Sequence, residues 1–143
     1  MSDMDGRTYL DATEETGRAF VMRNLQGPVC MLNLLRFKDT ADYSATPELA
    51  PDEPIPGAAA YDRYIEVTLP HLHESGGEVL FMGSGEGFLI GPPEMRWDLA
   101  MIVRHRDVET FLSFAQNEAY LDGVGHRTAA LEDSRLLPLT QHG

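Results

Sequence analysis

The chain has 143 residues, enough for one domain with a single buried core. It carries 23 acidic and 11 basic residues, and the net charge of −12 repels both nucleic-acid backbones and anionic lipid headgroups. Cys30 is the only cysteine, which excludes an internal disulfide and a CxxC redox pair. We therefore expect one domain over residues 1–143, with neither a nucleic-acid nor a membrane partner.

The first predicted element is a helix over residues 11–24. Asp11 is placed to act as its N-cap, and Glu14, three residues later, would complete a capping box. The Gly27-Pro28 pair then ends the helix. The polar, acidic residues before it lack the basic start and apolar core of a signal peptide. Apolar stretches elsewhere fall far short of the ~20 residues that span a bilayer, so we expect a cytoplasmic protein.

Two apolar runs, at 28–37 and 97–105, predict the central strands. In both runs apolar side chains occupy odd and even positions alike. A strand with one wet face would alternate instead, so these strands should be covered on both sides. Helices can cover one face, and a second subunit is the natural cover for the other.

Residues 39–57 form a proline-rich, acidic loop between the first strand and the next helix. Connections of this length are uncommon in compact domains and usually serve as lids, binding loops or disordered excursions. A solvated acidic insertion and a lid explain this loop equally well.

The remaining elements alternate between helices and strands. Tyr61 to Leu72 has helical spacing, and Gly76-Gly77 ends that helix. Strands are predicted over 78–90 and 95–105. Helices should follow, capped by Asp107 and Asn117, and the last strand, 134–139, is confined to a sheet edge by Pro138.

This order predicts an α+β fold of the ferredoxin-like type. After the extra N-terminal helix, the elements run βαββαβ, which gives an antiparallel sheet with both helices on one face. Because the other face would be bare in a monomer, we predict a homodimer.

Several motifs together resemble the domain of unknown function 1330 family. They are MLNLLRFKD, the Y-x-x-Y helix that ends in GG, the Trp97-Asp98 pair, and AYLDGVGHRTAALEDSRLL, spread over about Thr13 to Leu139. The resemblance implies the dimeric α+β barrel superfamily, whose members include cofactor-free monooxygenases, haem-degrading enzymes, isomerases and proteins with no shown activity. Fold alone therefore selects no chemistry. The loop at 39–57 is longer than in compact members of the family.

Asn33 is the sharpest candidate for a functional side chain. An amide within a buried strand must find hydrogen-bond partners, and it would bind either a ligand carbonyl or a neighbouring backbone group. Arg36, on the same strand, could hold a carboxylate ligand, although an ion pair with a nearby acid explains it better.

Trp97 and Asp98 are the next candidates. The indole would form a wall of a pocket while Asp98 orients Arg127 or the turn, because successive strand residues face opposite sides. The alternative places Trp97 in the core or in the dimer interface.

A third group lies on the last predicted helix. Tyr120 and Arg127 are seven residues apart and share a helix face, so together they would suit an anionic, partly aromatic molecule. His126 could transfer a proton near neutral pH, or it could be an ordinary surface residue. Capping and surface ion pairs explain Tyr120 and Arg127 almost as well.

The sequence predicts neither a metal nor a cofactor. His71 and His73 diverge by about 200° on a helix, and no third ligand has suitable spacing. The glycines of GSGEG match no phosphate-binding pattern.

Three hypotheses for function follow. The first is a small-molecule binder or cofactor-independent enzyme that acts on a small, anionic or carbonyl-bearing ligand in a cleft between sheet and helices. Asn33 and Arg127 would anchor or polarise the ligand, and Trp97, Tyr64 and Tyr120 would form the walls. The second is a non-catalytic dimerisation or accessory module. The third is a haem-binding or haem-degrading protein.

Overall fold

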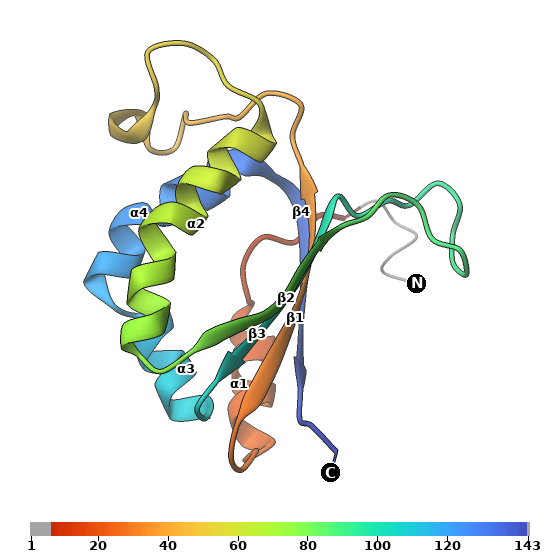
Figure 1. Ribbon diagram of the computed structural model, residues 1–143, viewed down its shortest axis with the longest axis vertical. Coiled ribbons are helices and arrows are strands. Elements are labelled where there is room, and N and C mark those ends of the chain that lie inside the picture. Colours follow the sequence, from red (N-terminus) through yellow and green to blue (C-terminus); the bar gives the residue numbers. More distant parts are fainter. Residues whose placement is uncertain (1–6, 143) are drawn as a thin grey trace.

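The computed structural model describes residues 7–142 and has an α+β architecture. Its elements are α1 (Glu14–Met22), β1 (Val29–Phe37), the 3-10 helix η2 (Pro47–Leu49), α2 (Gly57–Glu74), β2 (Glu78–Ser84), β3 (Leu99–His105), α3 (Val108–Ala115), α4 (Glu118–Ala130) and β4 (Leu131–Leu139). The sheet is antiparallel with strand order β2-β3-β1-β4. Figure 1 shows the helices on one side of this sheet. The predicted ferredoxin-like βαββαβ fold with an extra N-terminal helix is confirmed.

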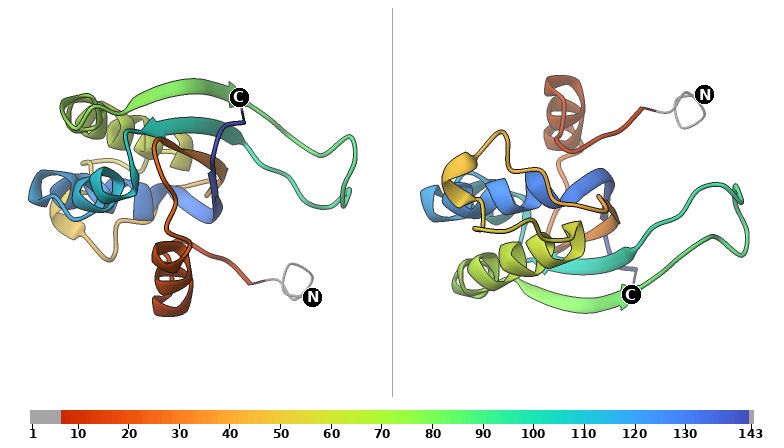
Figure 2. Two further views of the ribbon diagram at one scale, coloured as in Figure 1. Left: turned by 90° about the horizontal axis from the view of Figure 1, so that it is seen from below. Right: turned by 90° about the horizontal axis from the view of Figure 1, so that it is seen from above.

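The two faces of the sheet have different surroundings. Met31 and Leu35 of β1 point toward the helices and are buried, together with Met101 and Val103 of β3. On the opposite face, strand register aligns one apolar side chain from each of the four strands, in the order Phe81, Ile102, Leu32 and Leu137. We call this set the open-face row. Within residues 7–142 no helix covers it (Figures 1 and 2).

The N-terminal helix begins later than the sequence indicated. Thr13, not Asp11, is the N-cap: its hydroxyl accepts a hydrogen bond from the Thr16 N–H at 3.1 Å, and the Thr16 hydroxyl accepts from the Thr13 N–H at 3.0 Å. Helix α1 ends at Met22, and Asn24 lies in the left-handed region with φ 48°. None of its side chains is buried.

The hairpin between β2 and β3 also differs from prediction. The strand predicted over 78–90 stops at Ser84, and the one predicted from 95 begins at Leu99. The intervening residues form an arm, joined across by a bridge between Gly87 and Arg96, that extends away from the helices (Figures 1 and 2). Leu89 and Ile90, at its tip, remain exposed. The last strand begins at Leu131 instead of at residue 134, and Pro138 lies in this edge strand as predicted.

The loop at 39–57 is packed against α4. The Asp42 N–H donates to the Ala129 carbonyl at 2.9 Å, and the buried Tyr43 bonds His126. Ala41 and Ile55 are joined by a 2.9 Å backbone hydrogen bond across the loop. Its acidic side chains are exposed, as a solvated acidic insertion predicts, while Tyr43 anchors the loop to α4. None of the loop residues lines the cavity described below, and the lid interpretation stays a prediction.

Candidate functional site

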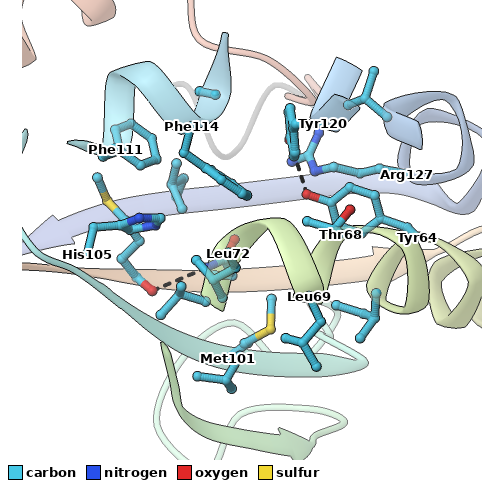
Figure 3. A pocket seen from close by; sticks show the side chains of 18 of the residues that line it. Tyr64, Thr68, Leu69, Leu72, Met101, His105, Phe111, Phe114, Tyr120 and Arg127 are labelled. Atoms are coloured by element: carbon cyan, nitrogen blue, oxygen red, sulfur yellow. Dashed lines mark hydrogen bonds between the residues drawn. The ribbon is translucent and has the colours of Figure 1, made fainter. Parts of the chain in front are cut away.

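A cavity of about 380 Å³ lies between the helix-facing side of the sheet and the helices (Figure 3). Its walls come from all four strands, from α2, α3 and α4, and from the segment that precedes α1. Most of the lining is apolar or aromatic, and the polar side chains within it are Asp11, Asn33, Tyr61, Tyr64, Thr68, His105, Tyr120 and Arg127. An apolar cavity with a few convergent polar groups is the usual form of a ligand site.

Arg127 lies at one end of this cavity beside two tyrosines. Its guanidinium donates to the Leu10 carbonyl at 2.7 Å and to the Ser134 hydroxyl at 3.4 Å. It makes no ion pair with a carboxylate of residues 7–142. The Tyr64 hydroxyl donates to that of Tyr120 at 3.1 Å. Burial, followed by the nearby Tyr120, raises the pKa of Tyr64 well above its ordinary value, so this phenol is neutral at pH 7.

His105 lies at the other end, between aromatic rings. Its ring centroid is 4.9 Å from that of Phe111 and 5.7 Å from that of Phe114. The residue is 3% exposed, and its buried Nδ1 has no hydrogen-bond partner among residues 7–142. Burial lowers the pKa of His105 to about 4, so the imidazole is neutral at pH 7.

Thr68 presents a second buried polar atom without a partner, its hydroxyl oxygen. Leaving such an atom unpaired costs roughly 1–3 kcal/mol, which a bound molecule can recover. Sequence reasoning missed His105 and Thr68 as polar wall residues. Strand alternation could have found His105, because it shares a face with the buried Met101 and Val103.

Asn33 lines the same cavity from the centre of β1. One N–H of its amide donates to the carbonyl of Met31 at 3.2 Å. A local backbone bond therefore holds the amide, and the residue still lines the cavity. Asn33, Tyr64, Tyr120 and Arg127, which were chosen from sequence, are brought together in one place.

Trp97 and Asp98 do not line this cavity, and the buried Trp97 fits the alternative that places it in the core or the dimer interface. The guanidinium carbons of Arg36 and Arg135 lie 5.5 and 5.1 Å from the centre of the Trp97 ring. Asp98 accepts from the Phe37 N–H at 2.8 Å instead of orienting Arg127. Both residues precede β3, so alternation within that strand does not fix their direction.

Arg36 and His126 likewise do not line the cavity. Arg36 forms ion pairs with Glu132 at 3.1 Å and Asp133 at 3.2 Å, the alternative that the sequence favoured. His126 Nδ1 lies 2.7 Å from the Tyr43 hydroxyl. Burial, and then the charge of Arg63, lowers the pKa of His126.

Among residues 7–142, no three His, Cys, Asp or Glu side chains are grouped closely enough to hold a metal ion. Over the same part of the chain, no helix combines the length and apolar character that crossing a bilayer demands.

Comparison with solved structures finds close relatives of this chain, although no family model and no curated protein matches it. The RPA0582 protein of Rhodopseudomonas palustris, of unknown function, is 34% identical over 96% of this chain and 99% of its own, with a TM-score of 0.83. Its methylated form gives 33% identity, 95% and 96% coverage, and a TM-score of 0.84. A dimeric ferredoxin-like protein of unknown function from Bacteroides fragilis shares the fold at 12% identity, 80% and 96% coverage, and a TM-score of 0.50. The chain belongs to the family of the RPA0582 protein.

Proposed function

We propose that the protein binds a small, largely apolar molecule bearing a carboxylate or carbonyl group in the cavity between sheet and helices. The observation that carries this proposal is Arg127, a permanent cation in a largely apolar cavity, paired with backbone and hydroxyl oxygens instead of with a carboxylate. The distributed motifs further favour membership of the domain of unknown function 1330 family.

Each polar group has a distinct part in this proposal. The Arg127 guanidinium binds a ligand carboxylate, because planar donors match its two oxygens and the dry surroundings strengthen the attraction. Asn33 donates its remaining amide N–H to a ligand carbonyl. Tyr64 and Tyr120 form aromatic walls and supply a hydroxyl proton. The same contacts would polarise a carbonyl if the protein is an enzyme.

The test compares acids with their uncharged analogues. A panel of small aromatic and aliphatic carboxylic acids, each matched with its primary amide, is screened by thermal shift and by native mass spectrometry. Acids should raise Tm more than their amides in the wild type, and Arg127→Gln should abolish this difference. Arg36→Gln is the matched control, since Arg36 lies outside the cavity. Equal shifts for acids and amides, or an unchanged preference in Arg127→Gln, would overturn the proposal.

We also propose that the protein is a homodimer joined through the open sheet face. The open-face row is apolar across all four strands, and Phe81 and Leu137 are 57% and 53% exposed. Contiguous exposed apolar side chains mark interaction surfaces. A two-fold axis lets the same face of two subunits pack against each other. The dimeric state described for the Bacteroides fragilis protein supports this assembly.

Light scattering after size exclusion tests the dimer. The wild type should have the mass of two chains, and Leu137→Arg should have the mass of one. Met22→Arg places the same charge on an exposed side chain of α1 and should leave the mass unchanged. A dimer that persists in Leu137→Arg would place the interface elsewhere.

A further inference from the structure

We propose that the His105 end of the cavity recognises a neutral hydroxyl or N–H group, so that the ligand is bifunctional. Its carboxylate would bind Arg127, its flat apolar body would fill the middle, and a phenol-like hydroxyl would meet the imidazole. The matching chemical class is the hydroxyaryl carboxylic acids. This inference rests on the proposed function and names the ligand class of that same site.

The two polar ends are well separated along the sheet. His105 pairs with Val29 of β1, and Ser134, which accepts a bond from Arg127, pairs with Leu35. These β1 positions are six residues apart, or about 20 Å at ~3.3 Å per residue. Figure 3 shows His105 and Arg127 at opposite ends of the cavity, from which their side chains reach inward. An elongated molecule can therefore contact both.

The middle of the cavity favours an apolar, flat body. Leu69, Leu72 and Met101 line it between the two ends (Figure 3). At the His105 end, the Phe111 and Phe114 rings meet the imidazole edge-on or tilted. Phe114 also lies 4.9 Å, centroid to centroid, from Tyr120. Aromatic walls of this kind pack best against another ring.

The chemistry of His105 selects a neutral group. The imidazole is buried and uncharged at pH 7, and no cation from the described part of the chain contributes to its pKa or could pair with an anion there. A carboxylate placed there would lose its hydration without compensation. A hydroxyl or N–H can instead donate to an imidazole nitrogen, and the buried Nδ1 has no other partner within the described protein. The unpaired Thr68 hydroxyl lies nearer Tyr64 and Tyr120 (Figure 3) and can hydrogen-bond a ligand carbonyl or hydroxyl.

The experiment measures what a single hydroxyl adds to binding. Three pairs of acids of increasing length serve as probes: 4-hydroxybenzoate with benzoate, 4-hydroxyphenylacetate with phenylacetate, and 4-hydroxycinnamate with cinnamate. Dissociation constants are determined by calorimetry for the wild type, His105→Leu, His105→Gln and Arg127→Gln. Thermal melts confirm that each variant is folded.

In the wild type, the hydroxyl should tighten binding by about tenfold for the length that spans the cavity. In His105→Leu, the hydroxy acid and the plain acid should bind with about equal affinity. His105→Gln, which retains a hydrogen-bonding side chain, should keep part of the gain even if the leucine variant unfolds. Arg127→Gln should weaken both members of a pair alike.

Two failures are distinguishable. The His105 inference is overturned, and the proposed function stands, if the plain acids bind through Arg127 but no hydroxyl adds affinity. The same holds if the hydroxyl adds as much affinity in His105→Leu and His105→Gln as in the wild type. If none of the acids binds in an Arg127-dependent manner, the proposed function falls, and this inference with it.

Discussion

The Tyr64 hydroxyl donates to the Tyr120 hydroxyl over 3.1 Å, which joins α2 to α4 at the wall of the cavity. Because Tyr64 uses its proton in this bond, the proton of Tyr120 is available to a ligand. The phenol of Tyr64 stays neutral at pH 7 because burial raises its pKa. The pair therefore has a direction, with the free donor on α4 beside Arg127.

This direction predicts unequal effects for the two phenylalanine substitutions. Each should lower the free energy of unfolding by about 1 kcal/mol, the usual net value of one hydrogen bond. Tyr120→Phe also removes the free donor and should weaken carboxylic-acid binding by roughly five- to tenfold, whereas Tyr64→Phe should change it by less than about twofold. Calorimetric titration with the acid panel measures both. Equal losses would show that the hydroxyl of Tyr120 has no direct contact with the ligand.

His105 predicts a pH-dependent stability. Burial lowers its pKa to about 4 in the folded protein, from 6.5 when exposed. As pH falls from 6.5 toward 4, the unfolded chain takes up a proton that the folded protein does not, so the free energy of unfolding decreases. The decrease should reach roughly 3 kcal/mol, since one pKa unit corresponds to ~1.4 kcal/mol.

Urea unfolding at several pH values checks the His105 prediction against His105→Leu, which should show a flatter curve over this range. The pKa of His126 is also lowered, so it contributes in the same direction in both proteins and cancels from the comparison. Parallel curves for the two proteins would contradict the prediction.

Gly57, the first residue of α2, should tolerate no side chain. A Cβ at this position would overlap the Lys38 carbonyl oxygen and lie 2.7 Å from that of Ala130, and backbone atoms do not yield easily. We expect Gly57→Ala to destabilise the protein by about 1–3 kcal/mol. Gly17 of α1 has no atom within 4 Å of the same position, so Gly17→Ala should be neutral or stabilising by up to about 1 kcal/mol. Thermal melts should give a lower Tm for Gly57→Ala and an unchanged or higher Tm for Gly17→Ala.

Asp98 should prove structural and not catalytic. Its carboxylate accepts the Phe37 N–H at 2.8 Å, where the register between β1 and β4 shifts. Asp98→Ala leaves that N–H unpaired and should lower the free energy of unfolding by about 1–3 kcal/mol. The affinity of the folded variant for carboxylic acids should be unchanged. Asp98→Asn keeps an acceptor oxygen and should recover most of the loss. A binding defect in a stably folded Asp98→Asn variant would return Asp98 to the functional site.

Tyr43 should hold the 39–57 loop against α4. Its hydroxyl lies 2.7 Å from His126 Nδ1, and Tyr43→Phe should lower the free energy of unfolding by about 1 kcal/mol. Limited proteolysis should then cut the loop faster. Tyr61→Phe is a useful comparison, since the Tyr61 hydroxyl makes no hydrogen bond within residues 7–142. Loop cleavage at the wild-type rate in Tyr43→Phe would indicate that apolar packing alone fixes the loop.

Local sequence patterns predicted those elements well whose bounds depend on contacts between residues close in sequence. Asp107 and Asn117 cap α3 and α4 as expected, because capping depends on residues two or three positions away. The apolar pattern of β1 indicated a strand covered on both faces; the helices cover one face, and the cover on the other face remains a prediction. The end of β2 could not be predicted in this way. Phe88, Leu89 and Ile90 have the composition of a strand, but a strand needs neighbours to pair with.

In the candidate site, too, local spacing predicted some residues correctly, whereas residues whose orientation depends on distant contacts were not predicted. Helical spacing placed Tyr120 and Arg127 on one face, and both line the cavity. Trp97 was assigned by residue type, yet its direction depends on contacts with two arginines from other strands, which sequence spacing does not encode. Sequence analysis missed His105, which ends an apolar run. Its alternation with Met101 and Val103 nevertheless places it on the buried face of β3. The functional roles of these residues remain predictions.

Residues 10–12 belong to the cavity wall, and the Leu10 carbonyl binds Arg127. Leu10, Asp11 and Ala12 precede α1, a helix that buries none of its side chains. A chain shortened to begin at Glu14 would retain the residues of the whole sheet and of every helix after α1. It would nevertheless present Arg127 to solvent without its strongest hydrogen bond. Intact secondary structure in a truncated protein would therefore be a poor guide to whether its binding properties survive.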